Sequence, residues 1–356
     1  MLSKRSILLG LMVVLTLLMG ACQPTPTEPD LPDPADLETT TLRLGFGIDP
    51  VFAPHIIAIE MGWFEEAGFT EIETVTFTAG ALAGEALAAG EIELWTPGNV
   101  PPISMIHAGL PVIVTGTNTP AYIEKFVMRT DVVMESPEDL YNIRIGLLEG
   151  STASAVLNNI ADQYGLDVGQ MEVVNLPPPE QMTSIINNEI QAFIVWNPWP
   201  YLAQQSEEVD VKVMHDGTTS YFPWDEGEEF QTSFTRSLWI MSEQFVVNNP
   251  NSANAIMQVL LRAQEYVRDP GNRDEVIQII SEFMDQPVEQ NQALWDEYNF
   301  ENVFDEDYIR DMQEYTDFLY EDGRITTRED PLSYTYTQFV ADFDPALVTV
   351  EGEWSP

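Results

Sequence analysis

The fold is decided by the stretch Ile143-Arg-Ile-Gly-Leu-Leu-Glu-Gly-Ser-Thr-Ala-Ser-Ala-Val-Leu157. Its apolar first half predicts a strand, and its second half predicts a helix that begins near Ser151. Gly150 allows a sharp turn between the two, and Ser151 or Thr152 can cap the helix. The first amides of such a helix are unpaired and can hold a polar group of a small ligand. Many α/β turns only cap themselves, so the motif alone leaves both interpretations open.

The same pattern occurs twice along the chain, which favours the functional interpretation. Each copy reads strand, helix, strand, helix, strand, and the copies are about 100 residues apart. This period is too long for a solenoid repeat and is typical of two similar lobes. The matching pairs are Leu42–Asp49 with Ile143–Gly150, Glu73–Phe77 with Glu172–Leu176, and Gly90–Pro97 with Asn188–Pro198.

Alternating strands and helices predict a mostly parallel sheet in each lobe, with helices on its faces. Ligands of such sheets bind beyond the carboxyl ends of the strands. Two lobes of this kind place those strand ends around a shared cleft. The four turns that we expect to line the cleft are residues 47–55, 95–102, 149–154 and 196–201.

Residues 1–21 have the layout of a secretory signal peptide, because Lys4 and Arg5 precede an apolar run that is too short to span a bilayer comfortably. The sequence Leu18-Met-Gly-Ala-Cys22 resembles a bacterial lipobox, so Cys22 is predicted to be lipidated. An ordinary signal with an incidental cysteine is the alternative. Residues 22–40 are rich in proline and acids and predict an extended, disordered tether.

The rest of the chain divides into three segments. Residues 41–130 are predicted to form the first part of lobe 1, residues 131–230 lobe 2, and residues 231–356 a return to lobe 1 with carboxy-terminal helices. The return is predicted to start with a strand at 232–241, and helices are predicted at 250–268, 273–284 and 305–320.

The chain is strongly acidic, with 14 Lys and Arg against 58 Asp and Glu and a net charge of -44. Phosphates would be repelled, so nucleic-acid binding is disfavoured. The simplest explanation is a solubility adaptation to salty or acidic surroundings. A cationic ligand is a functional alternative, although charge spread over a whole chain says little about one pocket.

The sequence carries no motif for catalysis or for a cofactor. His55, His107 and His215 are scattered without zinc-like spacing, and Cys22 is the only cysteine. No Ser-His-Asp arrangement or phosphate-binding loop is recognisable. We therefore expect a protein without enzymatic activity, cofactor or metal.

Several residues near the four turns are candidate ligand-binding residues, and each has a structural alternative. Ser151 and Thr152 could contact a ligand or only cap the helix. Trp95 and Trp196, at equivalent strand ends, could form flat walls or pack in the core. Arg236 is the cation best suited to an anionic solute, unless it forms a salt bridge on the return strand. The other candidates are Phe52 and His55 after the first strand, Asn99 and Asn197 in the adjoining turns, and Trp224 near the return crossing.

A series of short motifs runs through the chain: Pro54–Phe64, Glu65–Phe69, Ala89–Glu93, Ala108–Pro111, Ser136–Leu140, Gly150–Thr152, Glu189–Ala192 and Val247–Pro250. In this order they resemble solute-binding proteins of ABC importers of the nitrate, taurine and aliphatic sulfonate type, which are related to thiamine-pyrimidine binders. The resemblance covers residues 41–325. It implies an α/β, two-lobed type II periplasmic-binding-protein fold, in which each lobe is a mostly parallel sheet flanked by helices and the lobes close by hinge bending.

The resemblance also implies a monomeric, lipid-anchored receptor outside the cytoplasm that delivers a small solute to the transmembrane subunits of an ABC permease. The family favours a nitrate, sulfonate or taurine-type solute. The tryptophans and the shortage of cations instead favour a planar heterocycle, such as a thiamine pyrimidine precursor or riboflavin. Arginines that converge on the cleft would indicate the anion, and their absence the ring. One relative is a pyrimidine-synthesis enzyme with a cysteine-rich motif, and the single cysteine here argues against that activity.

Overall fold

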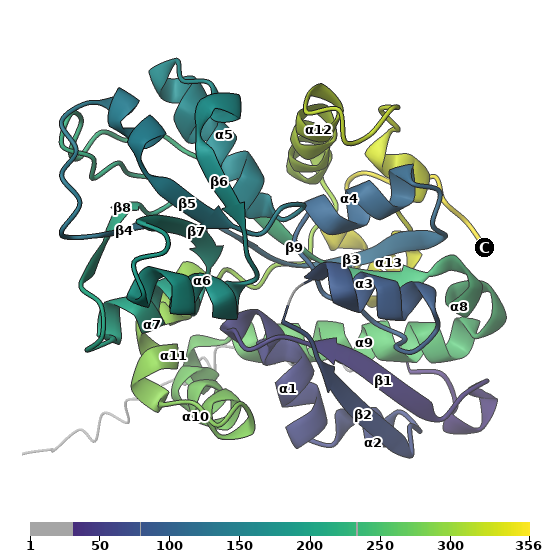
Figure 1. The fold of residues 1–356 in the computed structure, drawn as a ribbon. Helices are drawn as coiled ribbons and strands as arrows, with labels where there is room; N and C mark the ends of the chain where they lie inside the picture. Colours follow the sequence, from purple (N-terminus) through teal and green to yellow (C-terminus); the bar gives the residue numbers. More distant parts are fainter. Residues whose placement is uncertain (1–30, 79, 233) are drawn as a thin grey trace, which may run out of the picture.

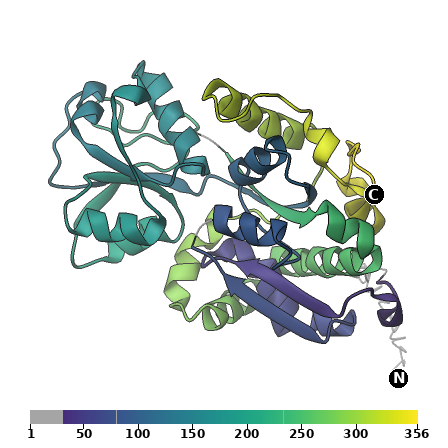
Figure 2. The same cartoon turned by 45° about the vertical axis from the view of Figure 1, so that its right-hand side comes forward.

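The computed structural model describes residues 31–356 apart from residues 79 and 233. Two lobes lie side by side, and the described chain passes between them near residues 121–124 and again just before Thr235 (Figure 1, Figure 2). The predicted signal peptide, Cys22 and the first part of the tether lie outside the described residues. Among the helices of the described part, none is both long and apolar enough to cross a bilayer.

Lobe 1 is built from residues near both ends of the chain. Strand β1 pairs in parallel with β2, and β3 pairs antiparallel with β9. Bridges from Leu44 to Leu94 and from Trp95 to Ile240 join the two pairs. The strands are β1 (Thr41–Phe46), β2 (Glu71–Thr76), β3 (Val112–Ala121) and β9 (Thr235–Ser242). The helices are α1 (Ala53–Glu60), α2 (Trp63–Glu66), α3 (Gly80–Ala88), α4 (Val100–His107), α8 (Glu243–Asn248), α9 (Pro250–Arg268), α10 (Arg273–Phe283), α11 (Val288–Leu294), α12 (Glu306–Glu321) and α13 (Gln338–Phe343).

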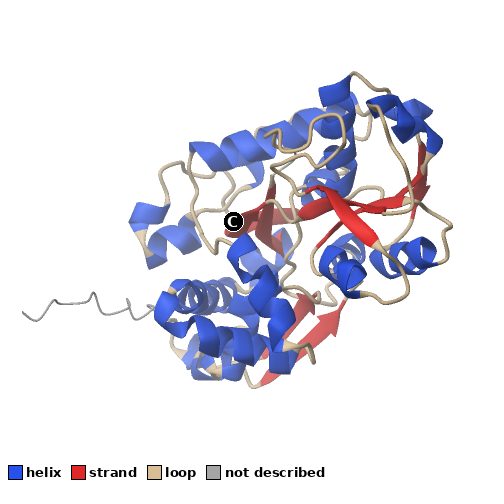
Figure 3. Ribbon diagram, turned by 90° about the vertical axis from the view of Figure 1, so that its left-hand side faces the viewer, coloured by secondary structure: helices blue, strands red, loops and turns tan. Residues whose placement is uncertain are grey.

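Lobe 2 contains a sheet of order β6-β5-β7-β4-β8, in which β4 runs antiparallel to both of its neighbours. Phe126 and Val127, which are adjacent on β4, belong to hydrophobic clusters on opposite faces of this sheet, and helices cover both faces (Figure 3). The strands are β4 (Glu124–Arg129), β5 (Arg144–Leu147), β6 (Glu172–Asn175), β7 (Ala192–Trp196) and β8 (Val211–His215). The helices are α5 (Thr152–Tyr164), α6 (Pro178–Ile186) and α7 (Trp199–Gln205).

The two lobes have the same strand order, as the sequence repeat predicts. The order β2, β1, residues 94–95, β9, β3 in lobe 1 corresponds to β6, β5, β7, β4, β8 in lobe 2. In each lobe the antiparallel strand is the one by which the chain arrives from the other lobe, β9 or β4. The predicted return strand and the last three predicted helices correspond to β9, α9, α10 and α12.

Lobe 2 begins earlier than predicted. Strand β4 lies in the lobe 2 sheet, so the chain has crossed before Glu124, whereas the predicted boundary is at residue 131. In the sequence, the capped turn that starts at Ser136 resembles the start of a lobe. In the structure it follows the first strand of that lobe.

The end of the predicted tether is ordered against lobe 1. The carboxylate of Glu38 accepts hydrogen bonds from the backbone amides of Asn251 and Ser252 in the first turn of α9, and Leu37 packs against the core. Amides at a helix N-terminus lack partners within the helix, so an acidic side chain stabilises them. The prediction of disorder is therefore wrong for this end of the segment.

Candidate functional site

A cleft of about 480 Å³ lies between the lobes and is lined by strand-end loops from both of them. All four turns that the sequence predicts to meet contribute to it. Lobe 1 supplies residues after β1 and after Trp95, and lobe 2 supplies residues after β5 and at the end of β7. Further lining residues follow β2 and β6, or start β4 and β9.

Aromatic side chains form much of the cleft wall. Trp95 is only 1% exposed, and its indole nitrogen has no hydrogen-bond partner among the described residues. Trp196 and Trp199 line the opposite, lobe 2 side, and Phe52 and Phe77 line the lobe 1 side. Such walls favour flat, apolar ligand surfaces, and the indole nitrogen offers a donor.

Two buried carboxyl groups, Glu124 and Asp49, also line the cleft. Burial raises the pKa of Glu124 to about 7, although the hydroxyls of Thr235 and Thr152 lower it by hydrogen bonding. Burial, together with the nearby charge of Glu124, raises the pKa of Asp49 to about 7, although the hydrogen bond from the amide of Val51 lowers it. Sequence reasoning missed both residues. The signal for Glu124 was an acid at the start of an apolar strand run, Glu124–Met128.

The described residues that line the cleft include no Lys, Arg or His. Arg324, close to Gly150 at the rim, forms an ion pair with Asp322. Lys125, next to Glu124 in sequence, forms an ion pair with Glu297. The charged groups on the cleft wall are therefore acidic.

Five predicted site residues line the cleft: Phe52, Trp95, Ser151, Thr152 and Trp196. The hydroxyl of Ser151 donates to the carbonyl oxygen of Leu148 at 2.6 Å, so it stabilises its own turn. The hydroxyl of Thr152, the first residue of α5, instead hydrogen-bonds to the carboxylate of Glu124 and lowers its pKa. Ser151 is the N-cap residue of α5, but its side chain makes no capping hydrogen bond to the helix.

His55 and Asn99, which were predicted as site residues, are not among the residues that line the cleft. His55 is fully buried behind the wall and hydrogen-bonds to Thr96, and burial lowers its pKa to about 3. The side-chain oxygen of Asn99 accepts from the backbone amide of Arg236 at 2.6 Å and ties α4 to β9.

Arg236, Asn197 and Trp224 also lie outside the cleft wall. The guanidinium of Arg236 pairs with Asp311, which is the salt-bridge alternative. The side-chain amide of Asn197 donates to Glu297 at 2.9 Å. Trp224 was expected at the cleft mouth, but it is partly buried against the core of lobe 2, where it stacks on Phe222 at 4.8 Å between ring centroids.

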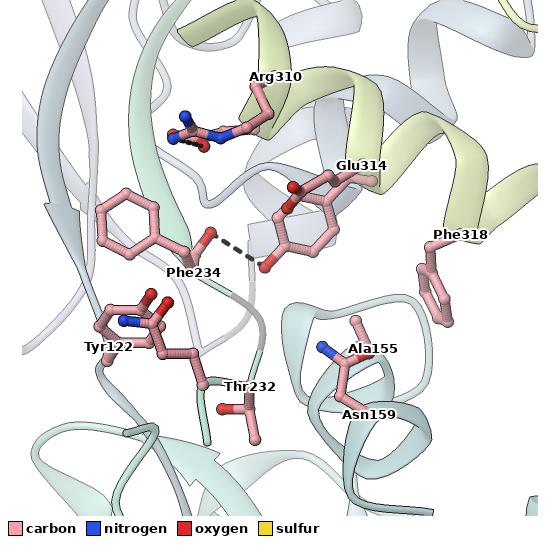
Figure 4. A pocket seen from close by; sticks show the side chains of 11 residues that line it. Tyr122, Ala155, Asn159, Thr232, Phe234, Arg310, Glu314 and Phe318 are labelled. Carbon is pink, nitrogen blue, oxygen red and sulfur yellow. Dashed lines mark hydrogen bonds and ion pairs between the residues drawn. The ribbon is translucent and has the colours of Figure 1, made fainter. Parts of the chain in front are cut away.

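A second pocket of about 560 Å³ lies beside the crossing segments (Figure 4). Tyr122 and Phe234 come from the two crossings, Asn159 from α5, and Arg310 and Phe318 from α12. Arg310 is paired with Asp307 and Asp311. This pocket is not lined by the strand-end loops that bind ligands in α/β sheets, so we place the candidate site in the cleft.

The family model described as the NMT1-like family matches residues 35–281 of the chain. The chain belongs to the NMT1-like family. This confirms the resemblance found in the sequence. The NMT1-like chain is 24% identical over 272 residues to the nitrate/nitrite binding protein NrtA of Nostoc sp., a match that covers 69% of this chain and 58% of that relative. The matched region therefore spans less than two thirds of the Nostoc protein.

Two solved structures share the fold of this NMT1-like protein. The alkanesulfonate-binding protein SsuA from Xanthomonas axonopodis pv. citri has a TM-score of 0.70 at 19% identity, over 84% of this chain and 99% of its own. The periplasmic nitrate-binding protein NrtA from Synechocystis has a TM-score of 0.67 at 18% identity, and the match covers 88% of this chain and 90% of the NrtA chain. These similarities confirm the predicted two-lobed periplasmic-binding-protein fold.

Proposed function

We infer that the chain is an extracytoplasmic solute-binding protein of an ABC importer, which captures a small solute between its lobes and delivers it to a permease. The observation that carries this proposal is the interlobe cleft of about 480 Å³, which is lined by strand-end loops of both lobes. This volume suits one small molecule. The names of the relatives support the same role, since NrtA and SsuA are named for the solutes they bind. Lipidation at Cys22 would keep the protein at the membrane surface.

The chemistry of the cleft favours a planar heterocycle over an oxyanion. A desolvated anion needs cationic or strong hydrogen-bond donors, and the described lining residues supply no cation. The lining carboxyl groups would repel an anion. The tryptophan and phenylalanine walls instead suit a flat ring, such as a pyrimidine or a flavin.

An oxyanion solute is the second candidate, because the relatives are named for nitrate and alkanesulfonate. In this chain the backbone amides at the start of α5 would have to hold it, since Arg236 is occupied by Asp311. A pyrimidine-synthesis enzyme is a third candidate, and the lack of a cysteine-rich motif argues against it.

A ligand screen tests the proposal. The purified full chain is titrated with nitrate, taurine, 4-aminopyrimidine and riboflavin, and its melting temperature and tryptophan fluorescence are recorded. Solute capture predicts a raised melting temperature for one class, and a ring compound should also quench Trp196. Trp196→Phe should weaken this binding several-fold, whereas Trp224→Phe, which lies outside the cleft and packs against the core of lobe 2, should leave it unchanged. If all four classes leave both signals unchanged, the proposal is wrong.

A further inference from the structure

We propose that the cleft selects a solute with a positively charged, planar nitrogen group, and that Glu124 and Asp49 bind this group. The inference rests on the proposed solute-binding role and names the class of solute. Amidines and protonated aminoheterocycles belong to this class, because their charge is spread over a flat group with several N–H donors.

Glu124 is placed to meet a ring that stacks on Trp196. The two residues are directly opposite each other in the β4–β7 ladder, so their side chains project to the same face of the sheet. One carboxylate oxygen of Glu124 accepts from the hydroxyl of Thr235 at 2.6 Å. This bond fixes the orientation of the carboxylate without neutralising it.

Asp49 is the second acid of the pair. It accepts from the backbone amide of Val51 at 2.8 Å and begins the short 3-10 helix Pro50–Phe52 after β1. Asp49 and Glu124 come from different lobes and interact as like charges. No described residue forms an ion pair with either of them. Buried negative charge without a counter-charge is unfavourable, so a cationic solute would supply what the protein lacks.

Two further polar groups on the cleft wall also lack partners. The hydroxyl of Ser237 and the indole nitrogen of Trp95 are 4% and 1% exposed by residue, and neither has a hydrogen-bond partner among the described residues. Both residues line the cleft. Buried polar groups are almost always hydrogen-bonded, so these two point independently to a ligand with polar atoms. The aromatic walls add cation–π attraction for a charged ring.

Protonation of the pair gives the binding a pH dependence. Both carboxyl groups have a pKa of about 7, so the empty cleft retains part of their protons near neutral pH. A bound cation favours the ionised carboxylates and displaces these protons. The hydroxyls of Thr235 and Thr152 lower the pKa of Glu124, and the amide of Val51 lowers that of Asp49. Burial raises the pKa of the neighbouring Tyr298 well above its usual range, and the charges of Asp49 and Glu124 add to this effect. Affinity for a cation should therefore rise from pH 6 to pH 8.

Three probes of one shape and different charge test the inference. Benzamidinium, benzamide and benzoate are titrated into the full chain by calorimetry at millimolar concentrations. We expect benzamidinium to bind best and benzoate worst, with benzamidinium binding that strengthens as the pH rises. Glu124→Gln should reduce the preference for benzamidinium over benzamide by about tenfold or more, which corresponds to about 1.4 kcal/mol. Glu207→Gln, which removes an exposed acid outside the cleft, should keep that preference.

The outcomes separate this inference from the proposed function. If benzamide binds as tightly as benzamidinium, or if benzoate binds best, the charge selection is wrong while solute capture stands. If none of the three probes binds, this inference is overturned, and the broader ligand screen decides the proposed function separately. Should Glu124→Gln fail to fold, Asp49→Asn and the pH dependence of the unmodified chain give the same decision. Unchanged preference in Asp49→Asn and pH-independent binding would overturn the inference.

Discussion

Arg236 on β9 donates to Asp311 on α12 at 2.6 Å, and the two side chains are 7% and 4% exposed. The pair explains why β9 brings no cation to the cleft. Thr235 and Ser237, the neighbours of Arg236 along the strand, both line the cleft. Successive side chains of a strand point to opposite faces, so Arg236 points toward α12. The pair therefore serves the packing of lobe 1.

Breaking this pair should destabilise the protein strongly. Asp311→Ala leaves the guanidinium of Arg236 buried and without its partner, which should cost about 3–5 kcal/mol of unfolding free energy. Chemical denaturation followed by circular dichroism measures the change. Asp296→Ala, which removes the exposed partner of Arg273, is the matched control and should leave the midpoint nearly unchanged. Equal effects of the two substitutions would show that the buried pair has no special role.

The absence of a side chain at Gly98 allows lobe 1 to approach Thr152 of lobe 2 closely. A Cβ atom at this position would lie 3.1 Å from the hydroxyl oxygen of Thr152 and 3.1 Å from a methyl group of Thr235. Gly98→Val should therefore hold the lobes apart and weaken solute binding on the order of tenfold, with a larger radius of gyration in X-ray scattering. Gly98→Ala should have the same sign and a smaller size. A Gly98→Val protein that binds as tightly as the unmodified chain would contradict this prediction.

Glu124 should make the empty protein less stable at high pH. Its pKa is raised from 4.5 to about 7 in the folded state, so its stabilising contribution is complete below about pH 4.5 and is lost as the pH rises through about 7. Glu124→Gln, which cannot ionise, should be more stable than the unmodified chain at pH 8 by up to about 3 kcal/mol, and the difference should vanish near pH 4. Urea denaturation at several pH values measures it. A difference that does not change with pH would mean that Glu124 does not titrate in this range.

The ordered end of the tether should contribute to the stability of lobe 1. Glu38→Ala removes the carboxylate that accepts from the first amides of α9, and the expected loss is about 1 kcal/mol. Thermal unfolding measures it. Asp36→Ala, two residues earlier and without a side-chain bond to α9, should have a smaller effect. The same loss in both variants would show that the contact of Glu38 with α9 does not matter.

The repeat made the cleft predictable from the sequence. The matched segments located β1 and β5, and also the equivalent strand ends at Trp95 and at the end of β7. Ligands of α/β sheets bind beyond the carboxyl ends of the strands, so these four places were expected to line one cleft. Trp95, Trp196 and Thr152 line the cleft for this reason. The positions of strands and of their ends could be predicted because they depend on the pattern of neighbouring residues in the sequence.

The remaining site residues could not be located in this way, because their direction depends on long-range register. Asn197 follows β7 directly, yet its side chain turns to Glu297, which is distant in sequence. His55 also follows the first strand, but its side chain does not reach the cleft: it contacts the ring of Phe52 and hydrogen-bonds to Thr96, both of which line the cleft. Glu124 was missed because residues up to 130 were assigned to lobe 1 and no strand was predicted at Glu124–Arg129, so nothing placed its side chain at the cleft. In contrast, the direction of Arg236 could have been predicted from the sequence. Successive residues of a strand point to opposite faces, so Arg236 must face away from the hydroxyls of Thr235 and Ser237.

The hydrogen bond from Thr235 to Glu124 joins the first residues of the two strands by which the chain enters each lobe. Both side chains also line the cleft, so the segments that connect the lobes contribute directly to its wall. A solute that contacts Glu124 would therefore contact a hydrogen bond that connects the two lobes. The angle between the lobes would then differ between the empty and the ligand-bound protein, and a membrane partner that binds their outer surfaces could distinguish the two states.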